Sequence, residues 1–201
     1  MTTETPAGHP IAERPVLPDV SIADPAPLGL AAFALTTFVL SLANAKVWET
    51  AEISAIALAV AYGGTAQLLA GMWEFKRNNT FGATAFSSYG AFWISFFFLT
   101  RIVPGADSQS VGTYLLGWTI FTAYMTVASL RVSGAILAVF VLLTITFALL
   151  TIGAFQESDN WTKAGGWVGV ATAAAAWYAS FAGVTNSTFK KVVLPVWPLT
   201  G

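Results

Sequence analysis

Six long hydrophobic stretches follow one another along the chain, separated by short segments that carry most of the charged residues. A helix needs about 20 apolar residues to cross the hydrocarbon core of a bilayer, and each stretch has about that length. Short connections favour antiparallel neighbours. The pattern therefore predicts an all-α integral membrane protein, a bundle of six transmembrane helices. The predicted spans are Leu28–Ala45, Ile53–Trp73, Phe81–Thr100, Val111–Leu130, Gly134–Ala154 and Gly165–Val184.

Composition supports the same fold class. Of the 201 residues, 56% are hydrophobic and only 9% are charged, against about 25% charged in soluble domains. No charge-rich linker separates the spans, so we predict one transmembrane domain, residues 24–188. The polar, proline-rich residues 1–23 are predicted to be a disordered cytoplasmic tail, and residues 189–201 a short cytoplasmic C-terminal tail.

Lysine and arginine are more numerous on one side of the predicted bundle. An excess of basic residues marks cytoplasmic loops, and the excess lies on the side that holds both termini. We therefore predict a multi-pass protein of the plasma (inner) membrane with both termini in the cytoplasm. The basic residues on the termini side are Arg14, Lys76, Arg77, Arg131, Lys190 and Lys191, and those on the other side are Lys46, Arg101 and Lys163.

Ionisable residues mark proton relays, ion sites and catalysis inside membranes, and they are nearly absent from the predicted spans. The exception is Glu74, at the end of the second span, where the sequence favours a solvated residue paired with Lys76 and Arg77. The single histidine, His9, lies in the N-terminal tail, and the chain has no cysteine. We therefore expect no enzyme, no metal site and no cofactor, and the net charge of −1 argues against a nucleic-acid partner.

Uncharged polar residues are present in the predicted spans and are unevenly placed. Thr36 and Thr84 have an ordinary explanation, because hydroxyl groups bond to helix carbonyls and join helices. Gln67 and Tyr89 need buried partners, so they face either a hydrated path or a dry helix contact. The Gly63-Gly64 pair, just before Gln67, favours close helix packing but could also expose backbone to a passing solute.

A pathway lined by hydroxyls, an amide and aromatic rings, with no fixed charge, suits a small and weakly charged solute. A monocarboxylic acid can be bound by neutral donors and by the positive end of a helix dipole. It crosses an apolar constriction most easily as the protonated acid. A pathway for metal cations would be expected to show carboxylate rings or carbonyl filters, and the sequence shows neither.

The first span opens on Asp24-Pro25-Ala26-Pro27-Leu28-Gly29-Leu30. Proline suits a first helical turn, and Asp24 is a plausible N-cap. With the motifs that follow, this segment resembles the acetate uptake transporter family of succinate–acetate permeases, which has asparagine in place of Asp24. The resemblance covers about residues 24–195. The further motifs are Tyr62-Gly63-Gly64 with Ala66-Gln67, Asn79-Thr80-Phe81-Gly82 with Thr84-Ala85-Phe86, Ser88-Tyr89-Gly90 with Phe92-Trp93, Phe147-Ala148-Leu149-Leu150, and Val193-Leu194-Pro195.

The resemblance implies a homo-hexamer of six-helix protomers, each with its own pore for acetate and often succinate, working as a channel or coupled to protons. It also implies a pore narrowed by Phe33, Tyr89 and Leu143. An acidic residue at the entrance repels an anion unless capping or pairing neutralises it, so Asp24 raises the alternative of a preference for the protonated acid. The predicted substrate pathway comprises Asp24, Pro25, Leu28, Gly29, Thr36, Gly63, Gly64, Gln67 and Thr84.

The leading hypothesis is therefore membrane transport of small monocarboxylates, chiefly acetate, through a neutral-lined pore in each protomer. Two other functions stay open from the sequence. One is a channel for another small neutral solute such as water or ammonia, and the other is a six-span sensor or scaffold that transports nothing.

Overall fold

The computed structural model describes residues 22–199, and the regular structure within that range is helical apart from one isolated bridge between Ser133 and Pro198. Six helical segments in this range are long and apolar enough to cross a membrane. The predicted all-α, six-span fold is confirmed. In chain order the elements are α1 (Ala26–Asn44), α2 (Ala51–Val60), the π-helix η1 (Ala61–Ala66), α3 (Gln67–Lys76), α4 (Thr80–Arg101), α5 (Ser108–Ser129), α6 (Gly134–Phe155) and α7 (Asp159–Phe189).

The observed helices follow the hydrophobic pattern closely except at the last span. Five predicted spans begin and end within three residues of the observed ones, whereas α7 runs for 31 residues, Asp159–Phe189, in place of the predicted Gly165–Val184. Hydropathy marks only the part of a helix that fits the hydrocarbon core. The polar turns at both ends of α7 continue the helix beyond that part, and Asp159 in the first turn complements the helix dipole.

The second span changes helix type in its middle, where α2, η1 and α3 follow one another without a break. Within η1 the hydroxyl of Thr65 donates to the carbonyl of Val60 at 2.8 Å. Gly63 and Gly64 are buried, and a Cβ on Gly63 would lie 2.6 Å from Oγ1 of Thr36, while one on Gly64 would lie 2.7 Å from a side-chain carbon of Ile94. Both glycines therefore permit close contact between this span and its neighbours α1 and α4.

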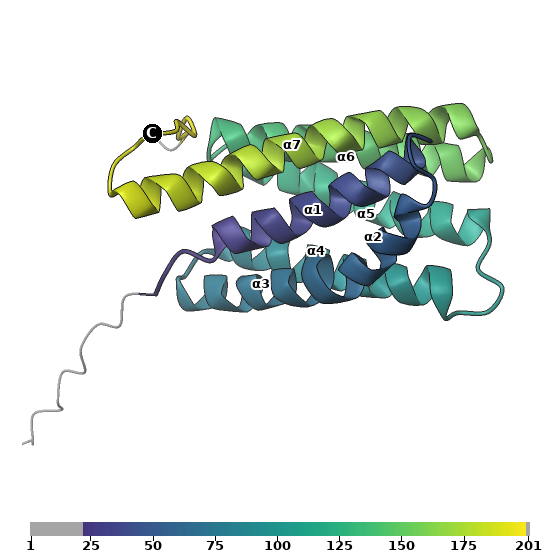
Figure 1. Cartoon of the computed structure of the whole chain (residues 1–201), viewed down its shortest axis with the longest axis horizontal. Coiled ribbons are helices and arrows are strands. Elements are labelled where there is room, and N and C mark those ends of the chain that lie inside the picture. Colours follow the sequence, from purple (N-terminus) through teal and green to yellow (C-terminus); the bar gives the residue numbers. More distant parts are fainter. Residues whose placement is uncertain (1–21, 200–201) are drawn as a thin grey trace, which may run out of the picture.

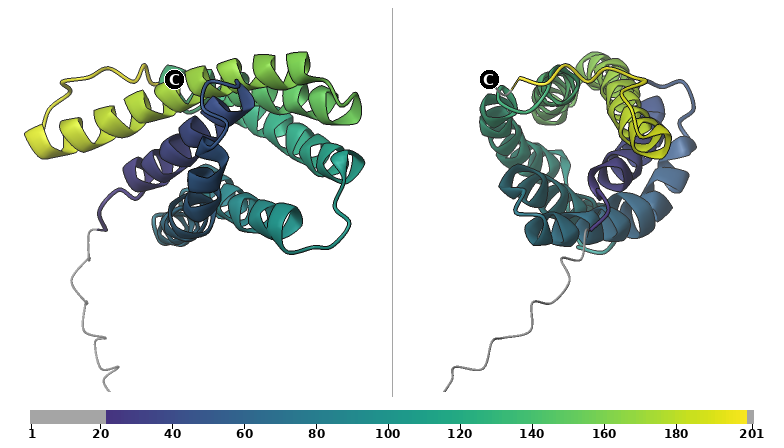
Figure 2. Two further views of the ribbon diagram at one scale, coloured as in Figure 1. Left: turned by 45° about the vertical axis from the view of Figure 1, so that its right-hand side comes forward. Right: turned by 90° about the vertical axis from the view of Figure 1, so that its left-hand side faces the viewer.

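The spans form a ring around the bundle axis (Figure 1; Figure 2, right). Each span packs against its neighbours in sequence, and α7 closes the ring along α1. The starts of α1 and α4 and the end of α7 lie at one end of the bundle, which we call the termini end (Figure 1). The opposite end, with the α1–α2, α4–α5 and α6–α7 connections, is called the far end.

The outer surface is rich in large apolar side chains, as expected for a protein that faces lipid. On α5 an exposed stripe repeats at helical spacing and includes Leu116, Ile120, Tyr124 and Val127. Exposed tryptophans lie near the ends of the spans, where tryptophan anchors membrane proteins at the interface. They are Trp48, Trp73, Trp161 and Trp167.

The segment after α7 is folded back over the termini end. Asn186 accepts hydrogen bonds from the backbone N–H groups of Val193 and Leu194 and donates to the carbonyl of Leu194 at 2.8 Å. The hydroxyl of Tyr178 donates to the carbonyl of Pro195 at 2.7 Å. The predicted C-terminal tail is thus an ordered strap up to residue 199, whereas the predicted disorder of the N-terminal tail concerns residues that lie almost wholly outside the described range.

Candidate transport pathway

Two cavities lie inside the bundle, one toward each end. The termini-side cavity has about 90 Å³ of space for water-sized molecules, and the far-side cavity about 170 Å³. The first is lined by residues of α1, α3, α4 and α6, and the second by residues of α1, α4, α5, α6 and α7. A small solute therefore has room at both ends of the bundle interior.

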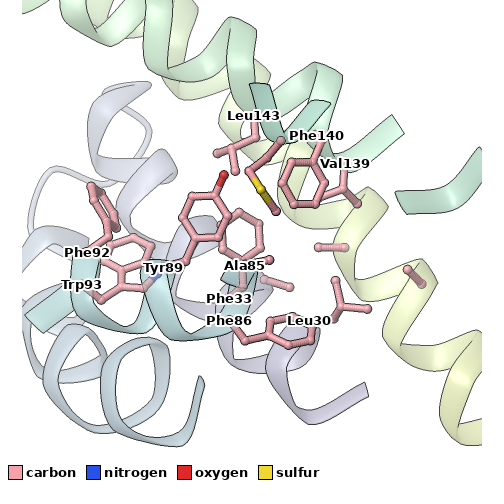
Figure 3. Packing of buried hydrophobic residues seen from close by; sticks show 14 of the residues in the cluster. Leu30, Phe33, Ala85, Phe86, Tyr89, Phe92, Trp93, Val139, Phe140 and Leu143 are labelled. Atoms are coloured by element: carbon pink, nitrogen blue, oxygen red, sulfur yellow. The ribbon is translucent and has the colours of Figure 1, made fainter. Parts of the chain in front are cut away.

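Phe33 of α1 and Leu143 of α6 line both cavities. The two side chains are only 5% and 3% exposed, and Figure 3 shows them in one cluster of buried side chains. Together they form an apolar partition between the two spaces. They are the two side chains that the linings of both cavities share.

Tyr89 of α4 completes the partition on the termini side. It lines the termini-side cavity, and its ring centroid lies 5.9 Å from that of Phe33. Its hydroxyl shares a hydrogen bond of 2.9 Å with the hydroxyl of Thr122, which in turn donates to the carbonyl of Trp118. The phenol is therefore paired, and the ring is fixed against α5 as well as α1.

Gln67 and Glu74 of α3 bring polar atoms to the termini-side cavity, which both line. Their side chains are 1% and 0% exposed, and Oε1 of each has no hydrogen-bond partner in residues 22–199. The expectation that Glu74 is solvated and paired with Lys76 and Arg77 is wrong. The start of α4 covers Glu74, and the side-chain amide of Asn79 donates to its Oε2 at 2.9 Å.

Asp24 lies at the mouth of the bundle, where it forms an ion pair with Arg77. Its carboxylate also accepts a hydrogen bond from the N–H of Ala26 at 3.1 Å. The predicted N-cap position is one residue off, because the capping residue by backbone geometry is Pro25, which has no side-chain acceptor. Asp24 still bonds to the first turn, and Arg77 neutralises its charge.

The far-side cavity has polar groups of a different kind. Thr37 and Trp93 line it at 6% and 3% exposure, and among the described residues neither Oγ1 of Thr37 nor Nε1 of Trp93 has a hydrogen-bond partner. Thr37 lies one turn beyond Phe33 on α1, and Trp93 one turn beyond Tyr89 on α4. Sequence reasoning does not select these two residues for the pathway, although Trp93 falls inside one of the motifs.

Most other residues predicted for the pathway lie beside the cavities. Leu28 is 46% exposed, and Gly29 packs so closely that an added Cβ would come within 2.6 Å of the ring of Phe86. Thr36 is buried, and its hydroxyl donates to the carbonyl of Ala32 at 2.9 Å. Besides Asp24, the predicted pathway residues that line neither cavity are Pro25, Leu28, Gly29, Thr36, Gly63, Gly64 and Thr84.

The described part of the chain contains no cluster of three or more histidine, cysteine, aspartate or glutamate side chains that could hold a metal ion. Glu74 is the one acidic residue that lines the termini-side cavity, and it is bonded to Asn79. Asp24, which lines neither cavity, is paired with Arg77. The pathway is thus lined almost entirely by neutral groups.

Comparison with known proteins identifies the family of this chain. The model of the GPR1/FUN34/yaaH family matches residues 9–201. The chain belongs to this family. Its resemblance to acetate uptake transporters is thereby confirmed.

Relatives within the GPR1/FUN34/yaaH family carry transport names. Acetate permease A of Emericella nidulans is 43% identical over 89% of this chain and 68% of its own length. The succinate-acetate/proton symporter SatP of Escherichia coli K12 is 37% identical over 89% of this chain and 97% of its own length. A solved structure described as that of the bacterial acetate channel SatP superposes with a TM-score of 0.83 at 37% identity, covering 88% of this chain and 99% of the other.

Proposed function

We propose that this protein transports acetate, and related small carboxylates such as succinate, across the membrane through a pore inside each protomer. The names of its family relatives and the close likeness to an acetate channel structure support this proposal. The single observation that carries it is the pair of cavities that meet at Phe33 and Leu143. They supply an interior route with one narrow, apolar point.

We place the gate at Phe33, Tyr89 and Leu143. Apolar side chains at a constriction exclude a hydrated ion, because the ion would have to shed water without gaining polar partners. A monocarboxylic acid meets a smaller barrier, since a proton removes its charge. The gate therefore favours a small acid over inorganic ions of similar size.

Of the predicted pathway residues, we assign two to direct contact with the solute. Asp24 contacts it at the mouth of the bundle, and Gln67 contacts it in the termini-side cavity. The others act by positioning helices. Gly29 lets α1 approach Phe86, and Gly63 lets the second span approach α1. Pro25, Leu28, Thr36, Gly64 and Thr84 belong to the same helix contacts and helix starts rather than to the cavity lining.

The termini end is assigned to the cytoplasm, in the plasma (inner) membrane of a bacterium or similar cell. Within residues 22–199 the basic side chains at this end outnumber those at the far end, as cytoplasmic ends require. The termini-end set is Lys76, Arg77, Arg131, Lys190 and Lys191, and the far-end set is Lys46, Arg101 and Lys163. Arg14, which was counted with the first set, lies outside the described range. The apolar outer surface leaves room for the homo-hexamer that the family resemblance implies.

Uptake of labelled acetate into vesicles containing the purified protein tests the proposed function. Because acetic acid crosses lipid unaided, uptake is compared with that of protein-free vesicles. We expect uptake well above this background, and we expect unlabelled succinate to compete with it. Uptake equal to protein-free vesicles contradicts transport and favours a sensor or scaffold. Protein-dependent flux of water or ammonia without acetate flux favours the neutral-solute channel.

A further inference from the structure

The two cavities differ in the buried hydrogen-bonding groups that they leave without a partner. The buried oxygens without a partner in the termini-side cavity, within the described range, are Oε1 of Gln67 and Oε1 of Glu74, which accept hydrogen bonds, and the amide of Gln67 can also donate. The far-side cavity has the indole N–H of Trp93, which can only donate, and the hydroxyl of Thr37, which can donate. A carboxylate accepts hydrogen bonds, whereas a carboxylic acid can also donate one. The far-side cavity thus offers donors to the anion, and in the termini-side cavity Oε1 of Glu74 offers an acceptor to the O–H of the acid.

Glu74 is the one ionisable side chain among the residues lining either cavity, tyrosine excepted. Its side chain is fully buried, with Oε2 bonded to Asn79 and Oε1 free. Leaving an ionised carboxylate oxygen buried without a donor is costly. A proton on Oε1, or a ligand O–H that donates to it, removes that cost.

The surroundings of Glu74 leave no cation to occupy Oε1. The charged groups that act on it are Asp24 and Arg77, and Arg77 is already paired with Asp24. The packed helix α1 carries no charged residue, and α4 carries none before Arg101 at the far end. Among the groups on α4 that can titrate, Tyr89 is the one near the cavity, and its hydroxyl is bonded to Thr122.

These two sets of polar groups lie on either side of the gate. Thr37 and Trp93 follow the gate residues Phe33 and Tyr89 by one helical turn toward the far end. Gln67 and Glu74 line the cavity on the other side, and they lie two turns apart on one face of α3. A solute that crosses the gate from the far side therefore leaves the donors of Thr37 and Trp93 and meets the unpaired oxygen of Glu74.

We infer that Glu74 exchanges a proton with the transported acid in the termini-side cavity, while Thr37 and Trp93 hold the carboxylate form in the far-side cavity. This inference rests on the proposed acetate transport. At the far end the carboxylate takes a proton from water, and the neutral acid crosses the gate. Its O–H then donates to Oε1 of Glu74. The acid's O–H bond then breaks, a bond from the proton to Oε1 forms, and acetate leaves as the anion. Water at the mouth takes the proton from Oε1 and restores the carboxylate, and transport in the other direction reverses these steps.

The test measures exchange of labelled acetate across vesicle membranes at equal pH on both sides, with total acetate fixed. Well above the pKa of acetic acid, the concentration of the acetate anion no longer changes with pH. A plateau in the exchange rate that ends at a midpoint pH therefore shows that a group on the protein gains or loses a proton there. The wild-type exchange rate is expected to stay constant as pH rises to such a midpoint and to fall above it. Exchange by Glu74→Gln is expected to fall about tenfold for each pH unit throughout, following the acid form alone.

The outcomes separate this inference from the proposed function. Wild-type exchange equal to that of protein-free vesicles overturns acetate transport, and the role of Glu74 with it. Protein-dependent exchange in which the Glu74→Gln profile is the wild-type profile scaled by a constant leaves acetate transport standing. It overturns the proton exchange, because a purely structural carboxylate would alter the rate and not the midpoint.

A second pair of variants keeps Glu74 itself and carries the test if Glu74→Gln fails to fold. Asn79→Asp retains an oxygen that can accept from the N–H of Gly82, as Asn79 does at 3.1 Å, but places a second carboxylate against Oε2 of Glu74. The midpoint is expected to move by about one unit toward higher pH, since like charges favour the protonated form. The control Asn78→Asp adds the same charge at an exposed neighbouring position and should leave the midpoint in place. An unmoved midpoint in Asn79→Asp overturns the inference.

The far-side half is tested by Trp93→Phe, which removes the N–H and keeps an aromatic ring. The acetate concentration for half-maximal exchange is expected to rise about tenfold, the value of one hydrogen bond to a charged group, with an unchanged pH midpoint. Half-saturation at the wild-type concentration would overturn the assignment of Trp93 to the carboxylate.

Discussion

Phe33 and Leu143 each line two cavities, and this double role is the main link between single residues and transport. Phe33 touches Tyr89 through their rings, and Tyr89 is fixed by Thr122. The polar residues on either side of the gate then determine which form of the acid is bound.

Replacing Phe33 by alanine should join the two cavities. We expect faster acetate flux and passage of larger carboxylates, because the ring that separates the spaces is removed. The variant should also lose about 3–5 kcal/mol of stability, as expected for a buried phenylalanine. Flux and thermal unfolding are compared with Phe38→Ala, which removes a ring that is only partly buried, packs on Trp177 at 5.1 Å and lines neither cavity. Equal flux in wild type and Phe33→Ala would show that the ring is not part of the gate.

Asp24→Asn should keep transport and shift its pH dependence. The amide oxygen can still accept from the N–H of Ala26, so the helix start survives, but the ion pair with Arg77 is lost. Arg77 then carries an unneutralised positive charge at the mouth, which attracts the anion. Acetate flux as a function of pH measures the effect. A profile identical to that of wild type would assign Asp24 to helix capping alone.

Sequence reasoning finds the polar side chains that need partners but not the partners themselves. Gln67 and Tyr89 stand out because an amide and a phenol in a hydrophobic stretch require one, and both line the termini-side cavity. Glu74 is misread because its neighbours Lys76 and Arg77 in sequence are not its neighbours in space. Asn79, at the turn into α4, bonds to Glu74, and Asp24 pairs with Arg77. Such contacts depend on how the ends of α1, α3 and α4 meet.

At the scale of the elements, hydropathy alone predicts the positions of the spans. It does not predict where a span changes helix type or extends beyond the hydrocarbon core. The π-helix η1 and the polar ends of α7 have no hydrophobic signal, so the sequence predicts one uniform second span and a short sixth one. Glycines predict helix contacts more clearly, because small residues at helical spacing allow two helices to approach closely. Gly166 and Gly169 of α7 are examples, since a Cβ on either would lie within 2.3 Å of atoms of α1 or of Ala45 just after it.

Gly90→Ala tests this packing. An added Cβ would lie 2.7 Å from the backbone nitrogen of Leu68 and 2.9 Å from the carbonyl oxygen of Gly64, and backbone atoms cannot move aside cheaply. We expect a loss of about 1–3 kcal/mol of stability, measured by thermal unfolding in detergent. The matched change Gly117→Ala meets no atom within 4 Å and should be neutral or stabilising by up to about 1 kcal/mol. Equal melting of the two variants would contradict the close approach of α3 and α4.

At the scale of the whole molecule, the ring of helices places a polar, charged surface at each end and an apolar partition between them. The ion pairs lie at the ends, where Arg77 meets Asp24 and Arg101 meets Glu52. The strap after α7 covers part of the termini end through Asn186 and Tyr178. The sequence predicts the number and order of spans, but the position of the cavities depends on side chains from four or five helices at once, which no local pattern encodes.

Because the chain has no cysteine, a single introduced thiol can be modified without background. The most direct test of the account is acetate flux through Leu143→Cys before and after reaction with a small thiol reagent, beside Ile145→Cys, whose position on the same helix is 44% exposed and lines neither cavity. We predict that modification blocks flux at position 143, that acetate slows the block, and that modification at position 145 leaves flux unchanged. Undiminished flux through a fully modified Leu143→Cys protein would show that acetate does not pass between these cavities.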